Sequence, residues 1–319
     1  FDRKQSNRIK FENPQNKLPL GYIVENKHIK KIIIEKIKNN KSIILVRDSL
    51  LKEVESTDNF ILSKTNNIII KSKLLIAADG KNSFVRNIIK TPIYNKSYKQ
   101  YALGINLDHL KNHQNIAYEL FYKTGPIGIL PMKSRSTNFF SSSIVWSNNL
   151  DYLKSLTAFE NTKMKFFLQD KLEEYLGEIV KIKNYKIFNL SAHVNSFFYE
   201  KRLVYVGDAA HSMHPIAGQG WNVGVRDIKN LMQSINDGVS LGLDPGDGYI
   251  CKNYHNKSFY DAFLMFQITD KLNSIFLKEG FIGNNIRKIG FEIIENHKKL
   301  NGLIANFAMG KRKNFLNFN

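Results

Sequence analysis

The sequence predicts an α/β protein in which a parallel-sheet domain is interrupted by an inserted, mainly antiparallel sheet and followed by helices. Two short apolar runs, at 73–78 and 202–206, end in Asp-Gly and Gly-Asp and are typical of buried parallel strands. Between them, apolar and aromatic segments alternate with turns, which indicates antiparallel strands. From Tyr249 onward the spacing of apolar residues is mostly helical.

Composition narrows the class of protein. The chain has 319 residues, 43% hydrophobic and 24% charged, so it can bury a large core, and its length suggests two domains. A net charge of +19 can attract nucleic acid or anionic lipid. Because the sequence contains no zinc knuckle, Arg-rich arm or other nucleic-acid module, we interpret the lysines as a solvated surface. We therefore expect no nucleic-acid partner and keep an anionic membrane surface as an alternative.

The cysteine count and the hydropathy of the sequence indicate the redox compartment of the protein and whether it spans a membrane. Cys251 is the single cysteine, so neither an intrachain disulfide nor a cysteine-based metal site is expected, which is consistent with a reducing compartment. No apolar run reaches the ~18 residues that a membrane span needs, and no signal peptide opens the sequence. We expect a soluble or peripheral protein.

Local patterns predict the elements in order. Asn26 is a good N-cap, and isoleucines at 29, 32–34 and 37 continue a helix from it. The remaining predictions are strands at 42–46, 60–62, 67–70 (pairing with 60–62) and 73–78, then strands at 117–122, 127–131, 138–141 and 143–146 with a helix at 155–176, then a strand at 202–206 and a helix at 222–236.

The strongest chemical signal is the segment from Val206 to Gly224, VGDAAHSMHPIAGQGWNVG. Because a buried strand ends at an acid, Asp208 is expected at the carboxyl edge of a sheet, where α/β folds bind ligands and where a carboxylate can accept hydrogen bonds from sugar hydroxyls. Pro215 stiffens the following turn, and glycines at 218, 220 and 224 let the backbone approach a flat ligand closely. The helix N-terminus that follows favours an electron-rich oxygen.

This segment resembles the second FAD-binding motif of the flavoprotein aromatic hydroxylases. The segment Ala77–Arg86 is similar to the A-D-G-x-x-S-x-x-R element of the same family, which lies near the FAD pyrophosphate and affects NAD(P)H use. The resemblance implies an FAD/NAD(P)-binding Rossmann-like domain. The residues that it implies for FAD binding are Asp79, Gly80, Arg86, Gly207, Asp208, Ala209, Pro215, Gly218, Gln219, Gly220 and Asn222. No protein group is implied as the catalyst, because the flavin carries the chemistry.

Further segments resemble the ubiquinone-biosynthesis hydroxylases, the polyprenyl-methoxyphenol hydroxylase group. They are Gly21–Asn26, the strand pair from Glu119 through Gly125-Pro126 to Leu130–Met132, and Gln219–Asp227. The resemblance implies FAD- and NAD(P)H-dependent hydroxylation of the aromatic ring of a polyprenylated phenol through a flavin hydroperoxide. A related flavin reductase acting on a prenyl chain is an alternative, which the strand pair disfavours. Glu119 either meets a substrate hydroxyl or faces solvent.

The start of the chain departs from the family pattern. The family opens with a strand, a G-x-G-x-x-G loop and a helix that cradle the FAD pyrophosphate, and no such loop occurs before Gly80. We therefore expect an N-terminally incomplete Rossmann-like domain with weakened FAD affinity, and an inactive truncated chain is a further alternative. The predicted boundaries are 17–96 and 197–319 for the FAD-binding domain and C-terminal helices, 97–196 for the substrate domain, and 1–16 for a strand segment of the substrate domain.

Other residues near the loop have two interpretations each. His211 and His214 offer too few ligands with suitable spacing for a metal site, so no metal is expected. His211 and Pro215 are expected to line the flavin, although His211 can instead cap the loop through a hydrogen bond. Trp221 packs on the flavin or, as we prefer, fills the core. Arg226 and Asp227 are interpreted as an ion pair that fixes the loop.

The C-terminal part suggests a route to a lipophilic substrate. Apolar residues between Ile275 and Phe291 and basic residues up to Lys311-Arg312-Lys313 have the composition of an interfacial helix. The alternative is that the apolar residues pack onto the FAD-binding domain. We expect a cytoplasmic protein, or one peripheral on the inner membrane (on the matrix side in mitochondria), with ubiquinone-biosynthesis proteins as partners.

Overall fold

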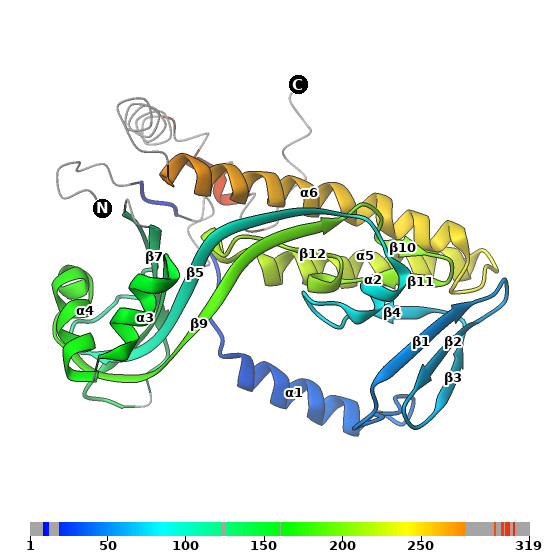
Figure 1. The fold of residues 1–319 in the computed structure, drawn as a ribbon, viewed down its shortest axis with the longest axis horizontal. Coiled ribbons are helices and arrows are strands. Elements are labelled where there is room, and N and C mark those ends of the chain that lie inside the picture. Colours follow the sequence, from blue (N-terminus) through cyan, green and yellow to red (C-terminus); the bar gives the residue numbers. More distant parts are fainter. Residues whose placement is uncertain are drawn as a thin grey trace. The chain divides into compact units, whose positions relative to one another are not determined.

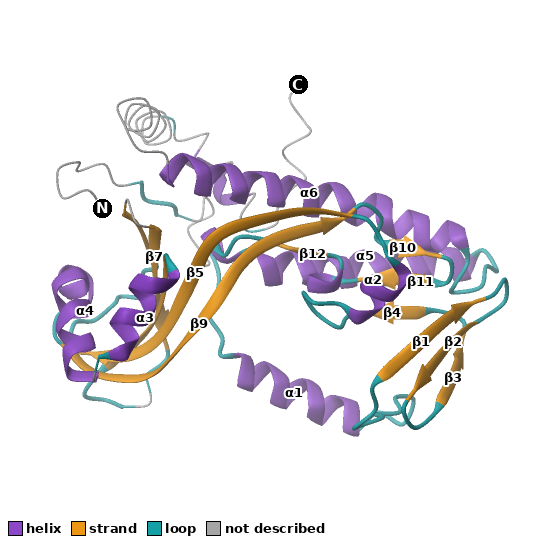
Figure 2. Cartoon of the chain, in the orientation of Figure 1, coloured by secondary structure: helices purple, strands orange, loops and turns teal. Residues whose placement is uncertain are grey.

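The computed structural model describes residues 9–12, 19–122, 125–134, 136–159, 161–277, 297, 301–302, 304–306 and 309. The chain separates into two compact units. The first unit comprises Phe1–His28, Tyr98–Leu190 and Lys271–Asn319, and the second comprises Ile29–Ser97 and Ser191–Asp270. Figures 1 and 2 show that both units combine helices with strands, as the predicted α/β class requires.

A small mixed sheet belongs to the second unit, with one antiparallel and one parallel pair of strands. Its strand order is β10 (Tyr199–Glu200), β11 (Leu203–Tyr205) and β4 (Leu75–Ala77). Strand β11 runs parallel to β4 and is buried along its whole length, as predicted. Strand β4 differs from the prediction because it is short and its central residue, Ile76, is 47% exposed.

The second unit also contains an antiparallel sheet and four α-helices. The strands β1 (Leu51–Ser56), β2 (Ile61–Thr65) and β3 (Ile69–Ser72) are adjacent in that order, and the predicted pairing of β2 with β3 is confirmed. The helices are α1 (Asn26–Lys38, which begins in the first unit), α2 (Phe84–Ile89), α5 (Gly220–Ser240) and α6 (Gly248–Leu277, whose last residues belong to the first unit). The predicted strand at 42–46 is wrong: no strand pairs with this segment, and Ile44 is 88% exposed.

A six-stranded sheet has the order β12-β9-β5-β8-β7-β6. Most of its residues belong to the first unit, whereas β12, the start of β5 and the end of β9 belong to the second. The strands are β5 (Ile93–His109), β6 (Tyr118–Tyr122), β7 (Gly125–Met132), β8 (Phe140–Asn148), β9 (Ile179–Asn195) and β12 (His211–Ser212). The β12-β9, β5-β8, β8-β7 and β7-β6 pairs are antiparallel. Antiparallel strands were predicted for the segments that form β6, β7 and β8, whereas β5, β9 and β12 were not predicted. The strands predicted separately at 138–141 and 143–146 form the single strand β8.

Two helices cover one face of this sheet and close the hydrophobic core. They are α3 (Leu150–Ala158) and α4 (Asn161–Leu176), which replace the single helix predicted at 155–176. The break occurs because Phe159 has an extended backbone after α3, and Asn149 caps the start of α3 by accepting from the Tyr152 amide. The core contains Leu103, Ile105, Leu107, Leu120, Ile127, Ile129, Ile144, Trp146, Leu153, Met164, Leu168 and Leu172.

Gly125 explains part of the Gly-Pro pattern through geometry. Its φ of +135° is a conformation that other L-residues rarely adopt. A Cβ at this position would lie 2.0 Å from the carbonyl oxygen of Ser147, so a larger residue cannot fit against strand β8. The glycine is therefore required by the packing of the β7 start and is not evidence of a chemical role.

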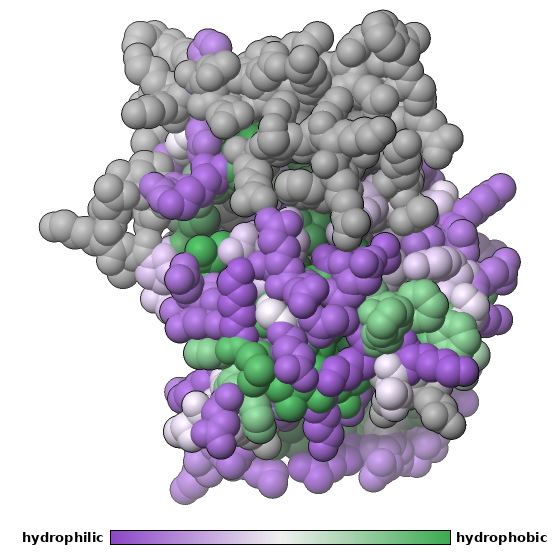
Figure 3. Space-filling view, turned by 90° about the vertical axis from the view of Figure 1, so that its left-hand side faces the viewer, coloured by the Kyte–Doolittle hydropathy of each residue, from purple (hydrophilic) through white to green (hydrophobic). Residues whose placement is uncertain are grey.

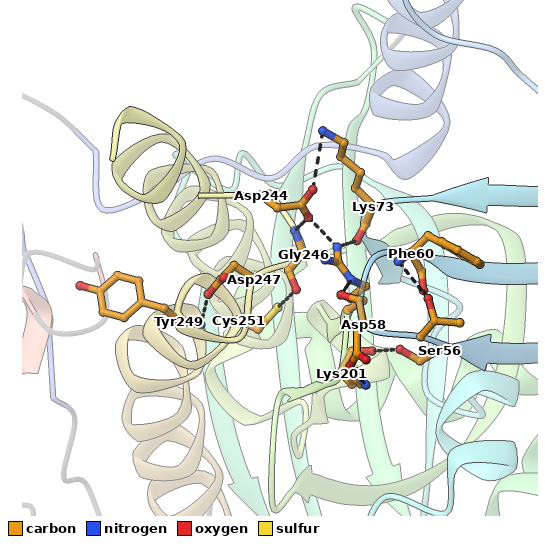
Figure 4. Close-up of polar contacts among 12 residues, drawn as sticks. Ser56, Asp58, Phe60, Lys73, Lys201, Asp244, Gly246, Asp247, Tyr249 and Cys251 are labelled. Atoms are coloured by element: carbon orange, nitrogen blue, oxygen red, sulfur yellow. Dashed lines mark hydrogen bonds and ion pairs between the residues drawn. The ribbon is translucent and has the colours of Figure 1, made fainter. Parts of the chain in front are cut away.

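Arg202 connects three segments of the second unit. Figure 4 shows the residues that it contacts, Asp58, Lys73 and Asp244. Its guanidinium donates to the carbonyl oxygens of Asp58 at 2.7 Å and Lys73 at 2.9 Å, and to Asp244 Oδ1 at 2.5 Å. Gly246 is required beside this cluster, because a Cβ there would lie 2.0 Å from the carbonyl oxygen of Lys73. The side chain thus joins β1–β2, β3–β4 and the α5–α6 connection.

On the face that Figure 3 shows, hydrophilic side chains cover much of the described surface and are interrupted by apolar patches. Within the described ranges, no helix is long and apolar enough to cross a membrane.

Candidate cofactor site

Asp208 lies at the carboxyl end of the parallel β4–β11 pair. Strand β11 ends at Tyr205, and the Val206 amide continues the pairing by donating to the carbonyl oxygen of Ala77 at 3.0 Å. Gly207 then reverses the chain with a φ of +58° and begins a 3-10 turn, Gly207–Ala209. The Asp208 side chain is exposed, and none of the described residues donates a hydrogen bond to it. Its carboxylate is therefore available to a ligand at the edge where α/β sheets bind them.

A carboxylate from helix α5 holds this turn in place. Asp227 Oδ2 accepts from the Gly207 amide at 3.0 Å and contacts His211 Nε2 at 2.6 Å, and the side chains of Asp227 and His211 are each 1% exposed. This is the loop-capping role that was one interpretation of His211. The predicted ion pair between Arg226 and Asp227 is wrong, because Arg226 instead pairs with Asp261 on α6 at 2.6 Å.

Two glycines let helix α5 approach the turn closely. A Cβ on Gly224 would lie 3.3 Å from Gly207 Cα, tighter than ordinary van der Waals contact. The glycine at 224 therefore serves helix-to-turn packing, whereas the sequence interpretation assigned it to contact with a flat ligand.

The loop before α5 provides an open backbone surface. Pro215 is exposed and precedes a second 3-10 turn, Ile216–Gly218, in which Gly218 has a φ of +59°. No atom lies within 4 Å of a Cβ built on Gly218 or Gly220. The first amides of α5 have no partner within the helix, as at every helix start. An electron-rich carbonyl oxygen of a flavin fits the open space at this helix N-terminus, so the residues present are compatible with FAD.

The residues at the start of α5 differ in burial. Gln219 is buried, and its side-chain oxygen accepts from Asn222 Nδ2 at 3.3 Å. Trp221 is 61% exposed, so the preferred prediction that it fills the core is wrong.

The Asp79 element is arranged as a capped turn. Gly80 has a φ of +86°, Asp79 Oδ2 accepts from the Val85 amide at 3.2 Å, and Ser83 caps α2 by accepting from the Arg86 amide. Asp79 itself is exposed. The side chain therefore both orders the start of α2 and keeps accessible surface.

Arg86 joins the two sequence elements to each other. Its buried guanidinium donates to the carbonyl oxygen of Lys81 at 2.6 Å, to that of Ala209 at 3.1 Å and to His193 Nε2 at 2.8 Å. Because these donors are directed at protein atoms, Arg86 positions the Asp79 and Asp208 turns and is not open to a ligand in this arrangement.

Three further residues of this region were not predicted. Lys81 donates to the carbonyl oxygen of Ser191 at 2.9 Å, and Asn195 Nδ2 donates to that of Ala209 at 3.2 Å. Burial first, and then the neighbouring Arg86 charge, lower the pKa of His193 to about 3, so the ring stays neutral and accepts from Arg86. The Lys81 and His193 contacts join residues 110 and 107 positions apart, and the Asn195 contact joins residues 14 apart. None of the three has a local pattern in the single sequence that predicts it.

No metal site accompanies this arrangement in the part of the chain that the structure describes. Burial lowers the pKa of His214 to about 4. Its Nδ1 accepts from the Ile216 amide at 3.3 Å, so the ring supports the 3-10 turn after Pro215.

Comparison with known proteins gives similar sequences and folds. Ubiquinone hydroxylase UbiL of Rhodospirillum rubrum is 29% identical over 296 residues, covering 92% of this chain and 68% of UbiL. Ubiquinone hydroxylase UbiM of Neisseria meningitidis is 25% identical over 294 residues, covering 91% and 62%. The mitochondrial ubiquinone biosynthesis monooxygenase COQ6 of Dictyostelium discoideum is 25% identical, covering 94% and 70%. The chain thus spans about two thirds of the length of these relatives.

Solved structures share the fold. The p-nitrophenol 4-monooxygenase PnpA of Pseudomonas putida superposes with a TM-score of 0.71 at 14% identity, covering 90% of this chain and 72% of PnpA. PqsL of Pseudomonas aeruginosa, described as a probable FAD-dependent monooxygenase, gives 0.65 at 16% identity, covering 78% and 70%. A family model described as "FAD binding domain" matches residues 48–238, more than half of the chain and all of the site described above. The α/β FAD-binding fold with a sheet domain is therefore confirmed, and the chain belongs to this family of FAD-binding-domain proteins.

Proposed function

We propose that this chain is an FAD- and NAD(P)H-dependent monooxygenase that hydroxylates the aromatic ring of a polyprenylated phenol in ubiquinone biosynthesis. The family match supports FAD as the cofactor. Three relatives, each matching more than nine tenths of this chain, are named as ubiquinone hydroxylases or as a ubiquinone biosynthesis monooxygenase. The structural observation that carries the proposal is the exposed Asp208 at the end of the β4–β11 pair, together with the open glycine backbone that begins α5. When bound, FAD supplies electron transfer from NAD(P)H and the activation of oxygen.

Each part of the site has a distinct role in holding the cofactor. Asp208 accepts hydrogen bonds from hydroxyls of the FAD sugar chain, and the first amides of α5 donate to the flavin carbonyl oxygens. The exposed Asp79 turn contributes from the neighbouring strand end. The residues that we assign to the cofactor surface are Asp79, Gly80, Gly207, Asp208, Ala209, Pro215, Gly218, Gln219, Gly220 and Asn222, with Arg86 holding the two turns together from behind.

The substrate class follows from the relatives. A quinone precursor with a prenyl tail is lipophilic, so we propose that the protein meets it at an anionic membrane surface, peripheral on the inner membrane and on the matrix side in mitochondria. The lysine-rich chain with its net charge of +19 supports this proposal electrostatically. The basic C-terminal segment that we predicted for this contact, including Lys311-Arg312-Lys313, lies outside the described residues.

Reconstitution tests the cofactor assignment. The purified chain is incubated with FAD, separated by gel filtration and assayed for bound flavin by absorbance. We expect Asp208→Ala to lose flavin relative to wild type, and Asp237→Ala, an exposed aspartate on the same α5 helix, to retain it. Equal flavin retention by all three proteins would contradict the assignment of Asp208.

Product analysis under ¹⁸O₂ tests the reaction. A monooxygenase acting on a prenylated phenol gives a product with one labelled oxygen and consumes NAD(P)H. A reductase acting on the prenyl chain gives a product that gains hydrogen and carries no label. The second outcome would replace the proposed reaction while leaving the FAD site intact.

A further inference from the structure

The sheet of the first unit has a face that points away from its core. Residues alternate between the faces of a strand, and the cross-strand row Leu120, Ile127, Trp146 and Leu103 belongs to the core under α3 and α4. The next row of the register is Glu119, Gly128, Val145 and Gly104 on β6, β7, β8 and β5. This row therefore occupies the opposite face, with Glu119 at its β6 end.

The carboxylate of Glu119 lies across the neighbouring strand. A Cβ built on Gly128 would be 3.1 Å from Glu119 Oε2, so the side chain occupies the space that the glycine leaves free. At the β5 end of the row, a Cβ on Gly104 would meet the Phe188 ring at 3.5 Å, an ordinary contact that does not involve Glu119. The two glycines thus differ in their relation to the carboxylate.

Glu119 has no partner within the part of the chain that the structure describes. No described side chain or amide donates a hydrogen bond to it, and no lysine or arginine pairs with it, although the chain has 47 Lys and Arg against 28 Asp and Glu. Glu119 is exposed, yet the protein atoms around it desolvate the carboxyl and raise its pKa to about 7. A carboxyl can be open to solvent on one side and crowded on the others. Glu119 therefore faces solvent, as one interpretation of the sequence had it, and is also crowded enough to raise the pKa of its carboxyl.

We infer that Glu119 is a substrate-binding residue whose carboxylate accepts a hydrogen bond from the ring hydroxyl of the phenol. The inference rests on the proposed function for the substrate class and adds the residue that recognises its hydroxyl. An unpaired, partly desolvated carboxylate forms stronger hydrogen bonds to a neutral donor than a solvated one does. The hydroxyl keeps its proton, because a phenol ordinarily ionises near pH 10 and transfer to Glu119 would be opposed by about three pKa units.

Binding of a matched ligand pair tests the inference without turnover. The ligands are a short-chain prenylated phenol and its O-methyl ether, which lacks the donor. Binding to the FAD-reconstituted chain is measured by calorimetry at about pH 8.5, where a carboxyl with a pKa of about 7 is ionised and the phenol is not. We expect wild type to prefer the phenol by about 10- to 100-fold, the range for a hydrogen bond to a charged group. Glu119→Ala should abolish the preference, and Glu119→Gln should reduce it while keeping a neutral acceptor.

A pair of glycine variants distinguishes the effect of moving the Glu119 carboxylate from a general effect on folding. Gly128→Ala keeps the carboxylate but forces it to move by a few tenths of an ångström, so we expect it to reduce the phenol preference. Gly104→Ala is the same change in the same row, away from Glu119, and should leave the preference unchanged; neither glycine has a positive φ that alanine would strain.

The outcomes distinguish this inference from the proposed function. A phenol preference that depends on Glu119 and Gly128 supports the inference even if no hydroxylated product forms. Failure to bind the phenol, or an unchanged preference in Glu119→Ala at wild-type melting temperature, would overturn the inference even if the chain hydroxylates phenols.

Discussion

Replacing Asp227 by alanine should destabilise the second unit strongly. The substitution removes the acceptor for the Gly207 amide and the partner of His211, both at hydrogen-bond distance from a carboxylate that is 1% exposed. Each hydrogen bond to a buried charged group contributes about 1.5–3 kcal/mol, and breaking a buried pair typically costs about 3–5 kcal/mol. We therefore expect a loss of about 3–5 kcal/mol in the free energy of unfolding.

Urea unfolding followed by tryptophan fluorescence measures this loss. Asp227→Asn keeps the size and one acceptor oxygen for the Gly207 amide, so its expected cost is smaller, about 1–2 kcal/mol. Asp237→Ala is the matched control: Asp237 lies on the same helix, is 51% exposed and pairs with Lys257 at 3.1 Å, so its cost should stay below about 1 kcal/mol. If Asp227→Ala and Asp237→Ala lower the unfolding free energy equally, the carboxylate does not hold the turn.

Three further outcomes are expected. Asp208→Ala should lower FAD retention yet leave the melting temperature of the FAD-free chain within a few degrees of wild type, because the side chain is exposed; a large drop in melting temperature would show a structural role. Burial lowers the folded-state pKa of His193 to about 3 and of His214 to about 4, whereas a histidine in the unfolded chain has a pKa near 6.5. Below pH 6.5 the unfolded chain therefore binds more protons than the folded chain, and the free energy of unfolding should fall as pH drops toward 4, by roughly 2 kcal/mol per histidine at pH 5. An unchanged slope of stability against pH in His193→Gln would contradict this. Cys251 is buried and its pKa is raised to about 11 by burial, so the folded chain should resist iodoacetamide at pH 8 and react in urea; rapid labelling of the native protein would refute its burial.

Much of the cofactor region was predictable because local patterns specify it. The apolar run before Asp208 predicted strand β11, which is buried along its length. The sequence after Gly220 predicted helix α5, which buries residues along one side. The same reasoning failed at 42–46, where β-branched residues have no partner strand, and at Trp221, whose aromatic character did not determine its burial. Strand propensity describes which backbone conformation a residue favours. Whether the residue joins a sheet or becomes buried depends on neighbours from elsewhere in the chain.

The contacts that position the site were the least predictable part. Arg86 was assigned to the cofactor from its motif, whereas its donors reach His193 and Ala209. Asp227 was paired with its sequence neighbour, whereas it caps a turn twenty residues earlier. Each of these contacts depends on tertiary packing, which the spacing of residues in a single sequence does not predict.

The Arg202 cluster has a consequence for the order in which the chain acquires its structure during translation. The carbonyl groups of Asp58 and Lys73 leave the ribosome well before their partner, and the intervening segment 98–190 belongs to the other unit. At about 5–20 residues per second, synthesis of that segment delays Arg202 by roughly 5–20 s. The nascent β1–β4 region must therefore persist for that time without the guanidinium that joins it to the α5–α6 connection, and a chaperone that recognises unpaired strand edges would find its substrate during this interval.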